Sequence, residues 1–214
     1  MIGILAYGSL IADPGWEILE NTDRWIRPVE TPFPVEYARR SKTRANAPTL
    51  VPVPFGKGDP VYAAVIVLKK EILLQQAMDI LYRREIHRIG DTSKAYREPD
   101  SLDTVKMRIV QLSNFADLNT VLYTKFPANF QQILDDKYDD YQKSDLLCVA
   151  ACTSLTEETF HTCQDGIHYL DAAIYSGVKT RLTELYAQAV LNAAGHNVVD
   201  LAIARALIAK SRGL

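Results

Sequence analysis

The chain has 214 residues, of which 48% are hydrophobic and 23% are charged, which is the composition of an ordinary globular protein. A formal net charge of −2 argues against a dedicated nucleic-acid binder, which usually carries a basic excess. No apolar run approaches the roughly 20 residues of a membrane span, and the first residues lack the basic start of a signal peptide. We therefore expect a soluble, cytoplasmic protein, monomeric or homodimeric, with no nucleic-acid or membrane partner.

The first half of the chain has mainly strand patterns, separated by turns. Strands are predicted at residues 2–7, 35–40, 49–55 and 61–68, with a short helical piece at 16–19. The prolines in 49–55 make it an edge strand at best, and Pro28, Pro32 and Pro34 exclude a continuous helix in their region. Residues 61–68 are nearly all apolar, so we expect a central strand with both faces covered.

The middle of the chain begins with a predicted amphipathic helix over about residues 70–85. Its apolar residues at helical spacing are Leu73, Ala77, Ile80 and Leu81. Strands are predicted at 105–112 and 120–125, whereas residues 144–154 fit either a helix or a buried strand.

The last third of the chain is predicted to be helical. A helix begins at Thr156, and further helices cover 166–175, 180–194 and 200–212, with Gly195 as a stop and Asp200 as an N-cap. Because strands come first and helices last, we expect an α+β fold. Residues 1–130 would form the core, and residues 131–214 would pack on it as a helical part of one structural unit.

The three cysteines are few and odd in number, which does not fit a disulfide framework. Cys148 and Cys152 stand four apart and would share one face of a helix. No second pair of ligands lies nearby, and the four histidines lack metal-ligand spacing, so buried small side chains are favoured over a metal site. We expect neither a metal nor a cofactor.

The loop after the first strand is one candidate for binding chemistry. A strand that ends at Gly8-Ser9 directs backbone N–H groups into the space above it, and such groups can hold a carboxylate or an oxyanion. Tyr7 adds a hydroxyl at the rim, and Leu10 completes the loop. From spacing alone, a plain turn is the more common interpretation.

Glu85 is a second candidate, near the end of the helix that follows the most apolar strand. Arg84 and Arg88 supply positive charge beside it. A solvated helix end with surface ion pairs is the usual interpretation of such a cluster. The sequence contains neither a nucleotide-binding phosphate loop nor a Gly-x-Ser-x-Gly nucleophile elbow.

Together the two segments resemble the gamma-glutamylcyclotransferases, most closely the glutathione-specific branch. The resemblance lies in Tyr7-Gly8-Ser9-Leu10 followed by Asp13-Pro14-Gly15, and in the apolar strand 61–68 followed by a helix that ends in Tyr82-Arg83-Arg84-Glu85. It covers about residues 1–112. After Glu85 that branch continues with Gly-Tyr, whereas this chain reads Ile86-His87-Arg88, so the substrate stays open.

The resemblance implies a small mixed β-barrel with flanking helices and a helical C-terminal extension. It implies a transferase- or lyase-type cyclisation in glutathione metabolism, in which a gamma-glutamyl compound yields 5-oxoproline and a free amine. Glu85 would be the catalytic acid and base, and no cofactor would be needed. The substrate-binding residues would be Tyr7, Gly8, Ser9, Leu10, Arg44 and Tyr96, with Arg39 as an alternative to Arg44 for pairing with a substrate carboxylate.

Two other functions remain open at this point. A non-catalytic protein on the same fold could bind small acidic metabolites through the loop without converting them. Alternatively, the helical last third could be an interaction surface, although the apolar stripe between Leu182 and Ala193 is more often part of a core.

Overall fold

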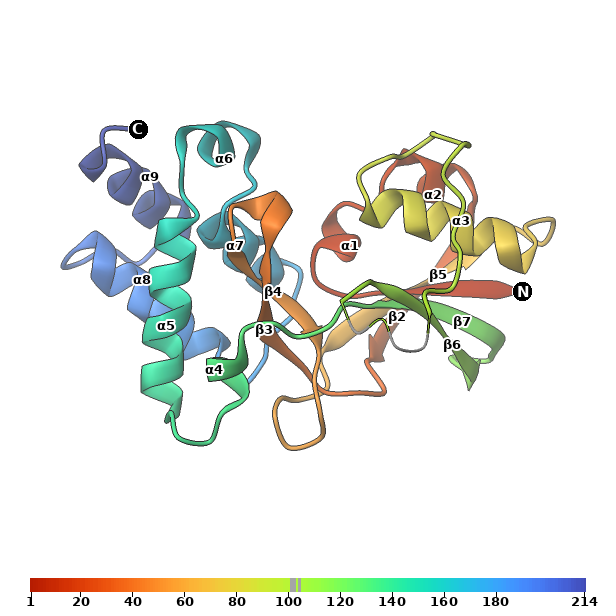
Figure 1. Cartoon of the computed structure of the whole chain (residues 1–214), viewed down its shortest axis with the longest axis horizontal. Coiled ribbons are helices and arrows are strands. Elements are labelled where there is room, and N and C mark those ends of the chain that lie inside the picture. Colours follow the sequence, from red (N-terminus) through yellow and green to blue (C-terminus); the bar gives the residue numbers. More distant parts are fainter. Residues whose placement is uncertain (101–102, 104) are drawn as a thin grey trace. The chain divides into compact units, whose positions relative to one another are not determined.

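The structure is a computed structural model, and it describes residues 1–100, 103 and 105–214. The chain divides into two compact units, one formed by residues 1–32 and 61–127 and the other by residues 33–60 and 128–214 (Figure 1). The second unit thus contains the predicted helical part, 131–214, together with residues 33–60.

A mixed five-stranded sheet forms the centre of the first unit. Its strands, in spatial order, are β2 (Thr22–Glu30), β5 (Tyr62–Leu68), β1 (Ile2–Ala6), β7 (Leu118–Lys125) and β6 (Arg108–Phe115). β1 is parallel to β7 and antiparallel to β5. The inner position of β5 was predicted, and every residue from Ala63 to Leu68 is fully buried.

The sheet is open, because β2 and β6 are its two edges. The predicted β-barrel is therefore not found among the described residues, although the α+β class is confirmed. β2 was not predicted as a strand. It contains Pro28, which cannot donate to a ladder, and it accommodates this residue at the sheet edge with a register shift between Ile26 and Val29.

The described residues of the first unit form three helices: α1 (Ser9–Ala12), α2 (Trp16–Glu20) and α3 (Leu74–Glu85). α3 begins at Leu74, later than predicted. Leu73 is its N-cap and is 67% exposed, so it is not a core residue. The other predicted core positions, Ala77, Ile80 and Leu81, are buried against the sheet, which α3 covers on one face (Figure 1). This packing fixes where the C-terminal end of α3 lies.

The second unit combines a two-stranded antiparallel sheet with six α-helices among its described residues. Its elements are β3 (Val35–Ser41), η1 (Lys42–Arg44), β4 (Ala47–Pro52), α4 (Gln131–Leu134), α5 (Asp140–Thr153), α6 (Glu157–Thr162), α7 (Gly166–Tyr175), α8 (Thr183–Ala194) and α9 (Leu201–Ser211). α5 settles the ambiguous segment 144–154 as helix. The predicted helix start at Thr156 and the predicted N-cap at Asp200 are confirmed, since both side chains accept hydrogen bonds at the starts of α6 and α9.

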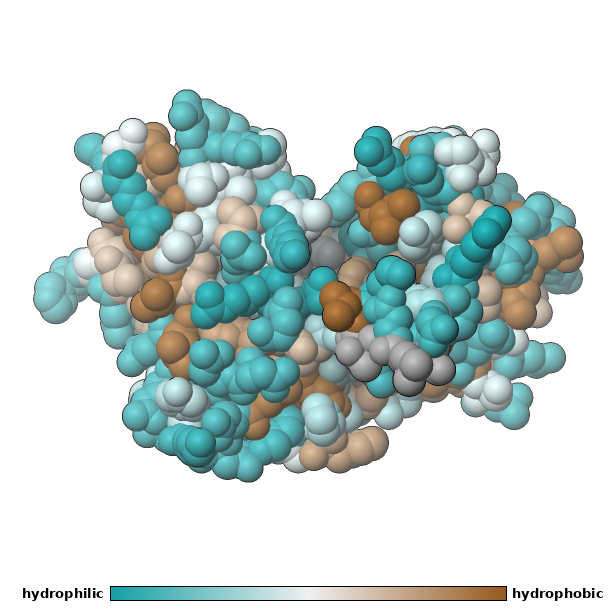
Figure 2. Space-filling view, in the orientation of Figure 1, coloured by the Kyte–Doolittle hydropathy of each residue, from teal (hydrophilic) through white to brown (hydrophobic). Residues whose placement is uncertain are grey.

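The surface carries hydrophilic residues with separated hydrophobic groups on the face drawn in Figure 2. Exposed hydrophobic residues occur in both units, for example Trp16 and Tyr175. Single exposed apolar side chains are normal in globular proteins and identify no partner. In the described part of the chain, no helix combines the length and the hydropathy needed to span a membrane.

Candidate functional site

The loop that follows β1 turns sharply at Gly8, whose φ of 58° and ψ of −136° suit glycine far better than any residue with a side chain. The short helix α1 then begins at Ser9, and its first carbonyls accept from Ile11 N–H at 3.2 Å and Asp13 N–H at 2.9 Å. Among the described residues, the N–H groups of Gly8, Ser9 and Leu10 have no hydrogen-bond acceptor. Three adjacent backbone donors are therefore available at this turn.

Arg84 connects this loop to the end of α3. Its Nη2 lies 2.6 Å from the carbonyl oxygen of Asp13 and 3.4 Å from Oγ of Ser9, and its Nη1 lies 3.0 Å from Oε1 of Glu85. The side chains of Arg84 and Glu85 are only 12% and 10% exposed, so solvent screens their ion pair less than it screens a surface pair. The predicted catalytic carboxylate and the predicted binding loop are thus brought to one guanidinium group.

Glu85 is the last residue of α3, and the two oxygens of its carboxylate differ in their hydrogen bonds. Oε1 accepts the bond from Arg84, whereas no hydrogen bond to Oε2 is found within the described residues. An ionised carboxylate with a free oxygen can accept a proton or a hydrogen bond from a ligand. The Oε2 oxygen of Glu85 is therefore available to act as a base, which a carboxylate with both oxygens in ion pairs would not be.

A buried ion pair between Glu17 and Arg83 holds α2 against α3, one residue before Arg84. Arg83 Nε lies 3.0 Å from each Glu17 oxygen, and Arg83 Nη2 also donates to Oε1. Gly90 N–H donates to Glu17 at 3.0 Å, and Arg83 Nη1 donates to the Lys94 carbonyl at 3.2 Å. Burial favours a raised pKa of Glu17, but the bonds from Arg83 and Gly90 outweigh it and lower this pKa.

Close packing explains why glycines occur at Gly15, before α2, and at Gly90, in the segment after α3. A Cβ atom at Gly15 would lie 2.6 Å from Cδ1 of Ile89, and a Cβ at Gly90 would lie 2.7 Å from Cζ2 of Trp16. Both glycines also have positive φ, 83° and 80°. The start of α2 therefore packs directly against the segment that follows Glu85, and a side chain at either glycine would push the two apart.

The two predicted tyrosines have different surroundings. The Tyr7 hydroxyl donates to the carbonyl oxygen of Thr124 at 3.1 Å and the side chain is partly exposed. Tyr96 is 6% exposed, donates to Glu98 at 2.5 Å and accepts from Ile109 N–H at 3.0 Å, and burial raises its pKa to about 12. The Tyr96 hydroxyl is therefore engaged within the protein, and its contact with a substrate stays a prediction.

Arg44 belongs to the second unit, in η1, where its guanidinium lies over the ring of Tyr169 with 5.1 Å to the centroid. Arg39, the alternative partner for a substrate carboxylate, lies in β3 of the same unit, and burial lowers its pKa. The roles of both arginines stay predictions.

Arg83 and Arg84 have different partners, which the sequence patterns did not predict. The sequence indicated positive charge beside Glu85 from Arg84 and Arg88. In the structure Arg83 forms a buried ion pair with Glu17, and Arg84 contacts the loop as well as Glu85. A helical turn of 3.6 residues places adjacent residues about 100° apart, so two neighbouring arginines at a helix end necessarily face different partners. The partner of Arg83, Glu17, is 66 residues away and gives no local signal.

Among the described residues, no group of three or more histidine, cysteine, aspartate or glutamate side chains could hold a metal ion. No protein-family model matches the chain. The comparisons with curated proteins and with solved structures returned no match either.

Proposed function

We propose that this protein is a gamma-glutamylcyclotransferase, which converts a gamma-glutamyl peptide, amino acid or amine to 5-oxoproline and a free amine. The observation that carries the proposal is the position of Arg84 between Ser9 and Glu85. It joins the two segments on which the family resemblance rests. The α+β fold is compatible with this function. The closed barrel that the resemblance implies was not found among the described residues, so barrel closure does not support the proposal.

The reaction needs positioning and proton transfer rather than a protein nucleophile. The α-amino nitrogen of the substrate attacks its own γ-carbonyl carbon, the ring amide bond forms, and the bond to the leaving amine breaks. Holding these two groups in contact distance lowers the barrier by several kcal/mol at least. Glu85 takes one proton from the substrate ammonium and returns it to the leaving nitrogen. The ring nitrogen loses a second proton after the attack, and this proton passes to the departing amine, which leaves as an ammonium ion. The Oε2 oxygen of Glu85 is suited to this role because Oε1 is occupied by Arg84.

The donors at the start of α1 suit the glutamyl end of such a substrate. The N–H groups of Gly8, Ser9 and Leu10 are adjacent, and successive backbone N–H groups can bind a carboxylate. The guanidinium of Arg84 adds positive charge beside them. In this proposal Tyr7, Tyr96 and Arg44 remain further substrate contacts to be tested.

The alternative function is binding of a small acidic metabolite without turnover. The same amides would bind the ligand, and Glu85 would serve only to hold Arg84. A direct assay separates the two functions. The purified protein is incubated with glutathione, with gamma-glutamyl amino acids and with gamma-glutamyl amines, and 5-oxoproline is quantified.

Release of 5-oxoproline from at least one of these classes, without added metal or cofactor, is the expected result. Thermal stabilisation by a gamma-glutamyl compound with no 5-oxoproline formed would favour the binding protein instead. The class with the highest kcat/KM would define the substrate that the sequence leaves open.

A further inference from the structure

Two cysteines of the second unit lie side by side on α5. The Sγ atoms of Cys148 and Cys152 are 4.0 Å apart, one helical turn from each other. Cys148 is buried, Cys152 is partly exposed, and the third cysteine, Cys163, is exposed at the end of α6. Cys152 is thus the more exposed residue of the pair.

The surroundings of Cys152 favour its thiolate form. The hydrogen bond from Cys148 lowers the pKa of Cys152, and the positive charge of Arg212 lowers it further. Arg212 is held in place, because its Nη1 donates to the backbone carbonyl of Cys152 at 2.6 Å. The pKa of Cys148 is raised by its hydrogen bond to Cys152 and by burial. A partly exposed thiolate beside a cation is the usual setting of a reactive cysteine.

A bond between the two sulfur atoms requires a limited change of the helix. Residues four apart on a helix have Cβ atoms about 5–6 Å apart, whereas a disulfide needs roughly 3.5–4.5 Å. Cys152 is the residue before Thr153, at which α5 ends. Only the last turn of α5 therefore has to open, while the turns before Cys148 keep their hydrogen bonds.

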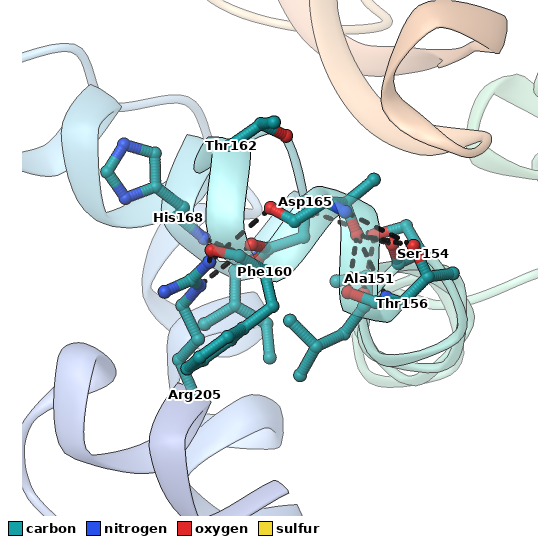
Figure 3. A network of polar contacts seen from close by, with 12 residues as sticks. Ala151, Ser154, Thr156, Phe160, Thr162, Asp165, His168 and Arg205 are labelled. Atoms are coloured by element: carbon teal, nitrogen blue, oxygen red, sulfur yellow. Dashed lines mark hydrogen bonds and ion pairs between the residues drawn. The ribbon is translucent and has the colours of Figure 1, made fainter. Parts of the chain in front are cut away.

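That last turn is tied to the start of α7 through Ser154. Figure 3 shows Ser154 beside Ala151, with Asp165 and Arg205 further along the same network. Ser154 N–H donates to Ala150 at 3.0 Å, its Oγ donates to Ala151 at 2.6 Å, and the same Oγ accepts from Gly166 N–H at 2.8 Å. Opening the turn would therefore loosen the contact between α5 and α7.

We propose that Cys148 and Cys152 are a site of reversible oxidation, at which hydrogen peroxide produces a disulfide within α5. The Cys152 thiolate attacks one peroxide oxygen, the O–O bond breaks, and sulfenic acid and hydroxide form. The Cys148 sulfur then attacks the sulfenic sulfur, loses its proton, and releases the second oxygen as water. Two thiols lose two electrons in total, and one peroxide becomes two waters.

The test uses the full-length, reduced protein, treated with hydrogen peroxide in rising ratios and then with an alkylating agent. Peptide mapping by mass spectrometry is expected to find Cys148 joined to Cys152, with Cys163 still alkylated, and a dithiol reductant should restore both thiols. This measurement on the unmodified chain needs no variant to fold. Cys152 found as sulfenic or sulfinic acid while Cys148 remains alkylated would overturn the proposal, and so would a disulfide that includes Cys163.

Variants test whether Cys152 is the thiol that reacts with peroxide and Cys148 the thiol that forms the disulfide. Cys148→Ser should leave Cys152 to stop at sulfenic acid, and Cys152→Ser should leave Cys148 unoxidised at the same peroxide ratio. Cys163→Ser is the matched control and should form the disulfide at the wild-type rate. Arg212→Gln should slow the reaction of Cys152 at neutral pH. An equal rate for Arg212→Gln and the wild type would exclude the role given to this cation.

Discussion

Arg84 contacts Ser9, 75 residues earlier in the chain, with 3.4 Å between Nη2 and Oγ. The same side chain pairs with the carboxylate of its neighbour Glu85 at 3.0 Å. One guanidinium group thereby sets the distance between the loop after the first strand and the acid at the end of α3. The proposed cyclisation depends on that distance, and Arg84 is the residue through which it can be altered.

Replacement of Arg84 by methionine is expected to reduce kcat/KM for 5-oxoproline release by about 100-fold, because small misplacements of catalytic groups have effects of this size. Arg88→Met removes an exposed arginine one turn further on and should retain wild-type activity. Steady-state kinetics with the best substrate provides the comparison. Equal kinetics for the two variants would mean that Arg84 does not position the site.

The ion pair of Glu17 and Arg83 is expected to stabilise the region around Glu85. Arg83→Met leaves a buried carboxylate without its partner, and such changes cost about 3–5 kcal/mol in the free energy of unfolding. The double variant Glu17→Leu with Arg83→Met should be more stable than Arg83→Met alone, since no uncompensated charge remains. Urea denaturation of the three proteins measures both differences.

Arg24 provides the control for this comparison. It pairs with Asp23 at 2.9 Å, but both side chains are about half exposed, at 48% and 51%. Arg24→Met should therefore change the free energy of unfolding by less than about 1 kcal/mol. A similar small loss in Arg83→Met would show that the buried pair contributes no more than a surface pair.

Glu36 predicts a pH dependence of stability in the second unit. Burial raises its pKa from 4.5 to about 7, although Thr180 and the Tyr37 N–H donate to its Oε1. The folded chain therefore holds a proton that the unfolded chain releases above about pH 4.5. Stability should fall as the pH rises from about 4.5 to 7 and then level off, with a total effect on the order of 3 kcal/mol.

Glu36→Gln removes the titrating proton and keeps an oxygen for the two donors. In urea unfolding between pH 5 and 8, this variant should lose most of the decrease that the wild type shows. Glu158→Gln changes an exposed glutamate of the same unit and should leave the decrease in place. A wild-type stability that rises over this range would have the wrong sign for a protonated Glu36.

Local patterns identified most of the elements, because their signals lie within a few residues. The apolar run of β5 and the caps at Thr156 and Asp200 needed no knowledge of distant contacts. β2 was not predicted because a strand can contain Pro28 only at the edge of a sheet. The edge position of β2 depends on the order of the strands, which the local sequence does not reveal. The open sheet likewise follows from strand pairing over long separations.

The same distinction applies to the site. Glu85 and the loop at Gly8 were found through short motifs, and Arg84 does join them. The partners of Arg83 and Tyr96 were not predictable, since Glu17 and Ile109 approach them only through packing of separate elements. Sequence patterns therefore named the candidate groups, whereas the folded chain determined which of their atoms remain available.

Glu85→Gln is the most direct test of the proposed chemistry, with Glu71→Gln, an exposed position before α3, as its control. The amide can still accept the bond from Arg84 but cannot take a proton at neutral pH. We expect the rate of 5-oxoproline release to fall by about 10²–10⁴-fold at an unchanged melting temperature, and Glu71→Gln to match the wild type. Release by a folded Glu85→Gln protein at the wild-type rate would contradict the role of Glu85 as the proton-transfer residue.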